Sequence, residues 1–182
     1  MPLINSDISI NTAELKKRLP DLHAGDTILL SGTVFSARDA AHKMLIALIK
    51  DDKPLPFKID GSVIYYCGPT PAKPGMPIGS SGPTTSSRMD IFMDTLLDLG
   101  LLATIGKGER SKDVCDTMKK HGAIYLCAMG GAGAISADCI KKCDVIAFEE
   151  LGCESIKKME FCNFPLIVGT DIYGNSIFNT KD

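Results

Sequence analysis

Apolar, β-branched segments alternate with amphipathic helical patterns through the middle of this 182-residue chain. Strands that are separated by helices form a largely parallel sheet with helices packed on it, so this alternation limits the possible folds strongly. The expected strands cover residues 25–34, 62–67, 101–105, 123–129 and 145–148, and the expected helices cover residues 11–19, 36–50, 89–97, 111–120 and 136–143.

The sequence pattern at the end of the chain differs from this alternation. Residues 149–158 contain a helical turn, and residues 165–171 and 175–178 predict a final antiparallel hairpin with its turn near Tyr173-Gly174. Parallel strands followed by an antiparallel pair indicate an α/β fold with a mixed sheet flanked by helices. The length suits one domain, residues 1–182.

Composition excludes several classes of function. The chain is 45% hydrophobic and 23% charged, which is enough for an ordinary globular core. Its net charge is −2 and it has no long basic run, so we expect no binding to nucleic acid or to a membrane surface. It contains neither a signal-peptide pattern nor an apolar run near the roughly 18 residues that a membrane span needs.

The cysteines suggest a reducing compartment. There are seven, an odd number without any CxxC pair, and most lie within apolar stretches. This usage predicts reduced, buried thiols in a cytoplasmic protein. Cys139 and Cys143 are four residues apart in an expected helix, but no histidine or further cysteine lies at zinc-finger spacing, so we expect no metal site.

Arg38 lies in the first turn of an expected helix, in register with the apolar stripe that includes Ala41 and Leu45. A cation is unfavourable at the positive end of a helix, and an anionic ligand would resolve the conflict. The alternative is a salt bridge to Asp39 or to another carboxylate. His42, one turn later, is interpreted as a surface or capping histidine with no assigned role.

A second anion-binding pattern follows a loop with five prolines and four glycines between residues 68 and 83. Four consecutive hydroxyl residues, Thr84 to Ser87, are followed by Arg88, and the next residues form an apolar helical face. Free helix N–H groups, hydroxyls and an arginine together suit a carboxylate or a phosphate. The alternative is an N-cap with more hydroxyls than it needs, with Ser87 and Asp90 as a capping box.

Lys107 stands between two glycines directly after an expected strand. In open α/β sheets, ligands bind outside the carboxyl ends of the strands, and glycines let a ligand approach the backbone. GGAGA at residues 130–134 is neither a dinucleotide fingerprint nor a phosphate loop. Two arginines and a lysine at element ends predict a site for a small di- or tri-anion, and these residues alone do not specify a reaction.

Several ordered motifs resemble the class I fumarate hydratases, in particular the C-terminal domain or β subunit of the iron–sulfur hydro-lyases that include L(+)-tartrate dehydratase. They are SGTVFSARDAAHK (residues 31–43), VIYYCGPTPAKPG (63–75), GPTTSSRMD (82–90), IGKGER (105–110), YLCAMGGAGA (125–134) and FEELGCESI (148–156). The resemblance runs from about residue 25 to residue 176.

This resemblance implies a swivelling β/β/α domain that works with a separate cluster-bearing α subunit or domain. The partner would carry a [4Fe–4S] cluster with one open iron that acts as a Lewis acid on the substrate. We therefore expect this chain to bind no cluster, to be inactive alone, and to function in a homo- or hetero-oligomer. The reaction implied is the reversible hydration of fumarate to malate.

The family's site residues carry over by motif. Arg38 matches an arginine that binds a substrate carboxylate, and Arg88 matches a second one. Lys107 matches the substrate-binding lysine, and Thr84 matches the threonine proposed as the base for the C3 proton. The alternatives are a β subunit of L(+)-tartrate dehydratase and a non-catalytic anion-binding or assembly protein.

Overall fold

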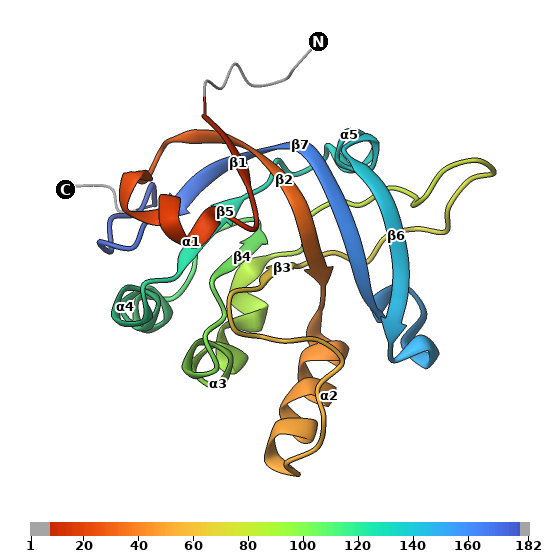
Figure 1. The fold of residues 1–182 in the computed structure, drawn as a ribbon, viewed down its shortest axis with the longest axis horizontal. Coiled ribbons are helices and arrows are strands. Elements are labelled where there is room, and N and C mark those ends of the chain that lie inside the picture. Colours follow the sequence, from red (N-terminus) through yellow and green to blue (C-terminus); the bar gives the residue numbers. More distant parts are fainter. Residues whose placement is uncertain (1–7, 179–182) are drawn as a thin grey trace.

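The computed structural model describes residues 8–178 (Figure 1). Its strands are β1 (Ile8–Asn11), β2 (Thr27–Ser36), β3 (Val63–Tyr65), β4 (Ala103–Gly106), β5 (Ile124–Cys127), β6 (Ile140–Ala147) and β7 (Ile156–Thr170). Its α-helices are α1 (Leu15–Arg18), α2 (Asp39–Lys50), α3 (Met93–Asp98), α4 (Lys112–His121) and α5 (Gly133–Asp138). Three 3-10 helices are η1 (Leu19–Asp21), η2 (Ser86–Phe92) and η3 (Glu149–Glu154).

The seven strands form one mixed sheet in the order β1-β2-β3-β4-β5-β7-β6. Strands β1 to β5 pair in parallel, whereas β7 runs antiparallel to β5 and β6. β7 also pairs antiparallel with β2, so β2, β3, β4, β5 and β7 form a closed circuit. The expected α/β fold with a mixed sheet is confirmed.

Alternation along the strands divides the apolar side chains between two cores. Val63, Tyr65 and Cys67 belong to the cluster bounded by β1, β2 and β7, whereas Ile64 and Tyr66 belong to the cluster beneath the helices. Successive strand side chains point to opposite faces, so a short strand can serve both cores. Figure 1 shows α2, α3 and α4 together on one side of the sheet.

The helix expected over residues 36–50 corresponds to α2, and the helix expected over 89–97 corresponds to η2 followed by α3. The apolar face predicted for the second helix is buried throughout: Met89, Phe92, Met93, Leu96 and Leu97. Ser36 and Asp39 have the spacing of a capping box at the start of α2, but Ser36 lies at the end of β2 and does not cap the helix. Ser36 instead bonds to Ser155 and Lys157 across the β2–β7 pairing.

The largest differences lie after residue 130. The helix expected over 136–143 is wrong, because α5 ends at Asp138 and residues 140–147 form β6. Cys139 and Cys143 therefore share no helix face. The final hairpin is present as a short antiparallel return, with a bridge between Thr170 and Ser176 and a turn at Tyr173-Gly174, but its first arm is the end of the long strand β7 and not a separate strand. Strand β7 is long because it pairs with both β2 and β6. Such pairing between distant residues cannot be predicted from a local sequence pattern.

The expectation of buried thiols holds only in part. Cys67 is buried, Cys153 and Cys162 are exposed, and the other four thiols are intermediate, but all seven are free. Burial raises the pKa of the Cys67 thiol to about 12. Within the part of the chain that the structure describes, no helix is long and apolar enough to cross a membrane.

Candidate active site

The candidate residues lie where neighbouring parallel strands end. Arg38 follows β2 by two positions, and Lys107 comes directly after β4. The segment that carries Thr84 lies against the chain just beyond β3, where the Thr84 amide donates to the Tyr66 carbonyl at 2.6 Å and a bridge joins Cys67 to Pro83. The carboxyl ends of β2, β3 and β4 therefore bring together segments far apart in the sequence, which is the usual location of ligand sites in such sheets.

Thr84 and Lys107 lie side by side along the backbone. The Lys107 amide donates to the Thr84 carbonyl at 3.2 Å, and the Ser86 amide donates to the Lys107 carbonyl at 2.9 Å. Gly106 makes this approach possible, because a Cβ there would collide with the Ser86 hydroxyl and with the Tyr66 ring. The glycine before Lys107 thus has a packing reason, and the lysine is held next to the threonine.

Arg38 is the N-cap residue of α2 and pairs with a carboxylate. Its Nη2 lies 3.5 Å from Oε1 of Glu154, and the other oxygen of Glu154 accepts from the Ala40 amide at 3.1 Å. Glu154 therefore supplies negative charge to both the arginine and the helix N-terminus, as electrostatics favours. The salt bridge weighed for Arg38 is present, with Glu154 and not with Asp39 as its partner.

Asp39 pairs with Arg88. Nη2 of Arg88 lies 2.7 Å from Oδ2 of Asp39, and Nε donates to Oδ1 at 3.3 Å. Arg38 and Asp39 are consecutive residues at the start of α2, and Asp39 contacts Arg88. Arg38 and Arg88 therefore belong to one cluster. The capping box of Ser87 and Asp90 does not form. Thr85 is the N-cap of η2 without a side-chain bond.

Two groups of this cluster keep their polar atoms available. The side chain of Lys107 is exposed and forms no ion pair with any residue between 8 and 178. The Thr84 hydroxyl is half-buried and makes no hydrogen bond within the same range. An ammonium and a hydroxyl without competing partners can both meet a ligand directly.

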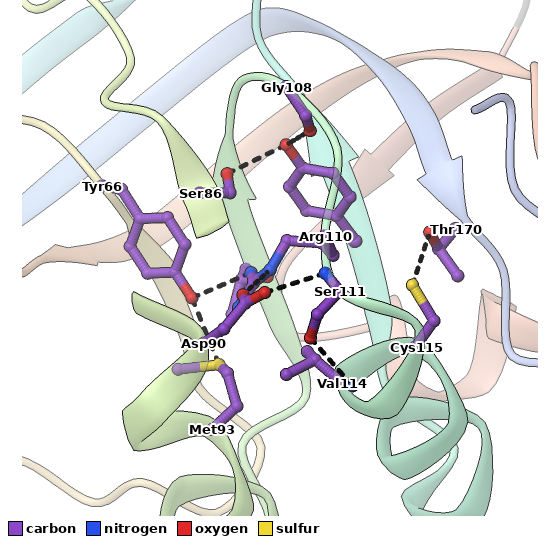
Figure 2. A network of polar contacts seen from close by, with 12 residues as sticks. Tyr66, Ser86, Asp90, Met93, Gly108, Arg110, Ser111, Val114, Cys115 and Thr170 are labelled. Carbon is purple, nitrogen blue, oxygen red and sulfur yellow. Dashed lines mark hydrogen bonds and ion pairs between the residues drawn. The ribbon is translucent and has the colours of Figure 1, made fainter. Parts of the chain in front are cut away.

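Sequence reasoning missed Arg110, which lies within a network of polar contacts with Tyr66, Asp90 and their neighbours (Figure 2). Its side chain is 0% exposed and its Nε donates to Asp90 at 2.6 Å. Its Nη1 donates to the hydroxyls of Tyr66 and Thr104, at 3.2 and 3.1 Å. The guanidinium carbon also lies 5.4 Å from the ring centroids of Tyr66 and Tyr125, where the ring faces stabilise the charge.

This buried network joins the two halves of the candidate site. Asp90, on η2, also accepts from the Ser111 amide at 2.8 Å, which fixes the chain just after Lys107. The Tyr125 hydroxyl donates to the Gly108 carbonyl at 2.7 Å and shares a hydrogen bond with Ser86 at 2.9 Å. No spacing rule identifies Arg110, because a surface arginine would give the same sequence pattern.

His42 is buried, which corrects its interpretation as a surface or capping residue. Its Nδ1 lies 2.8 Å from the Arg38 carbonyl, and its ring stacks on Phe92 with centroids 5.3 Å apart. Burial lowers its pKa to about 4, so the ring is neutral near pH 7. A neutral ring donates from Nδ1 to the carbonyl and thereby supports the backbone at Arg38.

Lys157 is a further charged residue that sequence reasoning did not identify. Its Nζ donates to the carbonyls of Gly152, Cys153 and Ser155 at 3.1 to 3.3 Å. Burial lowers the pKa of this amine. The lysine organises the end of η3 and so fixes the segment that presents Glu154 to Arg38.

The described part of the chain is expected to hold no metal ligands. Among residues 8–178, no group of three or more His, Cys, Asp or Glu side chains is placed to hold a metal ion. The Cys67 thiol is buried with a raised pKa, which disfavours the thiolate that would ligate iron. That this chain binds no cluster stays a prediction.

Comparison with known proteins is consistent with the motifs. Residues 4–181 match the family described as fumarase C-terminus. The chain is 38% identical over 178 residues to fumarate hydratase 2 of Leishmania major. It is also 38% identical over 177 residues to the anaerobic class I fumarate hydratase of Escherichia coli, and 38% identical over 169 residues to a putative L(+)-tartrate dehydratase subunit beta of Methanocaldococcus jannaschii.

The share of each relative that is matched differs. The alignments cover 97% and 96% of this chain but only 31% and 32% of the two fumarate hydratases. The alignment with the tartrate dehydratase subunit covers 90% of this chain and 87% of the relative. The match to the family model spans nearly the whole chain, and the chain belongs to the fumarase C-terminus family.

Proposed function

We propose that this chain is the β subunit of a [4Fe–4S]-dependent hydro-lyase that reversibly hydrates fumarate to malate. The observation that carries the proposal is the cluster of Thr84, Arg88 and Lys107 with Arg38 at the carboxyl ends of parallel strands. Relatives named as fumarate hydratases and as a tartrate dehydratase subunit support the reaction class.

In this proposal the cations bind the two carboxylates of the substrate. Arg38 and Arg88 each retain N–H groups beyond those that face Glu154 and Asp39, and a guanidinium can bind a carboxylate through two such groups. Lys107 adds a positive charge next to Thr84. Three cations against two nearby carboxylates leave the cluster with a net positive charge, which favours a dianion.

Thr84 is the proposed base. In the dehydration direction the C3–H bond breaks and Oγ1 of Thr84, as the alkoxide, takes the proton. The electron pair stays on the substrate as a carbanion-like aci-carboxylate and then forms the C2=C3 double bond as the C2–O bond breaks. The departing hydroxide takes up the proton held by Thr84, which gives water and restores the alkoxide. An ordinary alcohol is a poor base, so the charges of Arg88 and Lys107 are needed to stabilise the alkoxide and the intermediate.

The rest of the site would come from another chain. We propose that a cluster-bearing α subunit completes it and that its cluster, when bound there, supplies Lewis acidity toward the substrate hydroxyl. The exposure of Arg88 and Lys107 supports a site that a second surface covers. Residues 1–182 would act as one swivelling β/β/α domain in a cytoplasmic homo- or hetero-oligomer, without nucleic-acid or membrane partners.

Two alternatives use the same cations. A tartrate dehydratase β subunit is favoured by the match over 87% of such a relative. A non-catalytic anion-binding or assembly protein would need the cations and not Thr84.

Reconstitution distinguishes these three hypotheses. The chain is mixed anaerobically with a candidate cluster-bearing subunit, iron and sulfide, and fumarate absorbance is followed beside L(+)-tartrate consumption. The proposal expects fumarate turnover in the mixture and in neither component alone. If neither diacid is turned over although the cluster is intact, the hypothesis that this chain is an enzyme subunit is rejected.

A further inference from the structure

The contact between Asp39 and Arg88 is made through two points. Asp39 accepts from both Nε and Nη2 of the guanidinium, at 3.3 and 2.7 Å. Two parallel bonds of this kind fix the plane of a guanidinium as well as its position. A single-point ion pair would leave the group free to rotate.

This arrangement leaves a defined edge of Arg88 available. A guanidinium has five N–H donors, and Asp39 engages one on Nε and one on Nη2. Nη1 makes no hydrogen bond with the residues that the structure describes, and the Arg88 side chain is 49% exposed. The donors that remain are therefore those that an anion in the site would meet.

The fold sets both partners of this contact. Asp39 is in the first turn of α2, whose Ala40 amide is held by Glu154 at 3.1 Å. Arg88 is in η2, which packs on α2 through the stacked rings of Phe92 and His42, 5.3 Å apart. Each side chain thus projects from an anchored element, unlike most exposed ion pairs.

We propose that Asp39 is a positioning residue, which turns the free edge of Arg88 toward a carboxylate of the substrate. This inference rests on the proposed function, in which Arg88 binds that carboxylate. A purely electrostatic role predicts the opposite sign, because removing a negative charge beside an anion site strengthens binding of a dianion. A simple surface salt bridge predicts no effect.

The kinetic test compares Asp39→Asn with Asp113→Asn in the reconstituted complex. Asp113 is likewise in the first turn of a helix, α4, but is exposed and lies outside the site. We expect Asp39→Asn to raise KM for the dicarboxylate about tenfold with a smaller change in kcat, while Asp113→Asn leaves both constants unchanged. An unchanged or lower KM in Asp39→Asn would overturn the inference.

A double-mutant cycle shows whether Asp39 acts through Arg88. If it does, Asp39→Asn has little further effect on kcat/KM in an Arg88→Ala background. Equal effects of Asp39→Asn in both backgrounds would mean an independent role, and the inference would then be wrong.

A spectroscopic readout separates this inference from the proposed function. Arginine side-chain NMR of the 182-residue chain follows the Nε–H signal of Arg88, assigned by its loss in Arg88→Lys. We expect slow exchange with water in the wild type and at least about tenfold faster exchange in Asp39→Asn. Absence of turnover in the reconstituted wild type would reject the proposed function. Equal exchange rates of the Arg88 Nε–H in the wild type and in Asp39→Asn would reject the positioning contact.

Discussion

The Arg110 guanidinium and the Asp90 carboxylate lie 2.6 Å apart inside the protein, and this pair joins the segment that carries Lys107 to the helix that carries Arg88. The same carboxylate holds the Ser111 amide. Two segments of a candidate site that come from separate parts of the chain are thus tied together by one buried charge pair.

We predict that Asp90→Asn destabilises the fold. The substitution leaves the fully buried Arg110 without its counter-charge, and breaking such a pair costs about 3–5 kcal/mol. Urea denaturation measures the change in the free energy of unfolding. The matched control is Asp116→Asn, which breaks an exposed pair with Lys112 and should cost less than about 1 kcal/mol. Equal, small losses in both variants would contradict a structural role for the buried pair.

Thr84→Val should abolish proton transfer without affecting folding. Valine keeps the shape and removes the hydroxyl, while the backbone contacts of Thr84 to Tyr66 and Lys107 stay intact. We expect kcat of the reconstituted complex to fall by about 10²–10⁴-fold, the range of general acid–base catalysis. Thr85→Val is the control, because its exposed side chain makes no capping bond. Similar kcat values for the two variants would rule out Thr84 as the base.

His42 should make the stability depend on pH. Its pKa is about 4 in the folded chain and 6.5 when exposed, so between these values the unfolded chain binds a proton that the folded chain does not. The free energy of unfolding should therefore fall by about 3 kcal/mol as pH drops from 6.5 to 4, and the loss is complete below 4.

Comparison with His42→Asn isolates this effect, because asparagine keeps a donor near the position of Nδ1 and does not titrate. Denaturation of both proteins between pH 4 and 7 gives the difference in slope. Parallel curves for the wild type and His42→Asn would show that His42 is not buried as described.

Local pattern was enough to predict the middle of the fold. Residues with a regular spacing, such as Met89, Phe92 and Leu96, form a buried face because helical periodicity places them on one side. Pattern failed after residue 130, where residues 136–143 were expected to form a helix. Residues 140–147 form β6 because β7 offers a long partner, and such distant pairing overrides local preference.

The candidate site also contains residues that the sequence predicts and residues that it does not. Arg38, Thr84, Arg88 and Lys107 could be proposed from sequence because strand ends and helix starts are local features. Their partners could not. Glu154 holds Ala40 from 114 positions away, and Arg110 gains its meaning only from the rings and carboxylate that surround it. Contacts across such distances depend on the finished fold.

If these cations form the substrate site, kcat/KM of the reconstituted complex depends on Arg88, and the variant Arg88→Ala measures that dependence. Lys43→Ala is the matched control, since it removes an exposed cation of α2 outside the cluster. We expect Arg88→Ala to lower kcat/KM at least about 100-fold, while Lys43→Ala leaves it unchanged and both variants keep the wild-type free energy of unfolding. Wild-type activity per folded molecule in Arg88→Ala would show that Arg88 does not bind the substrate.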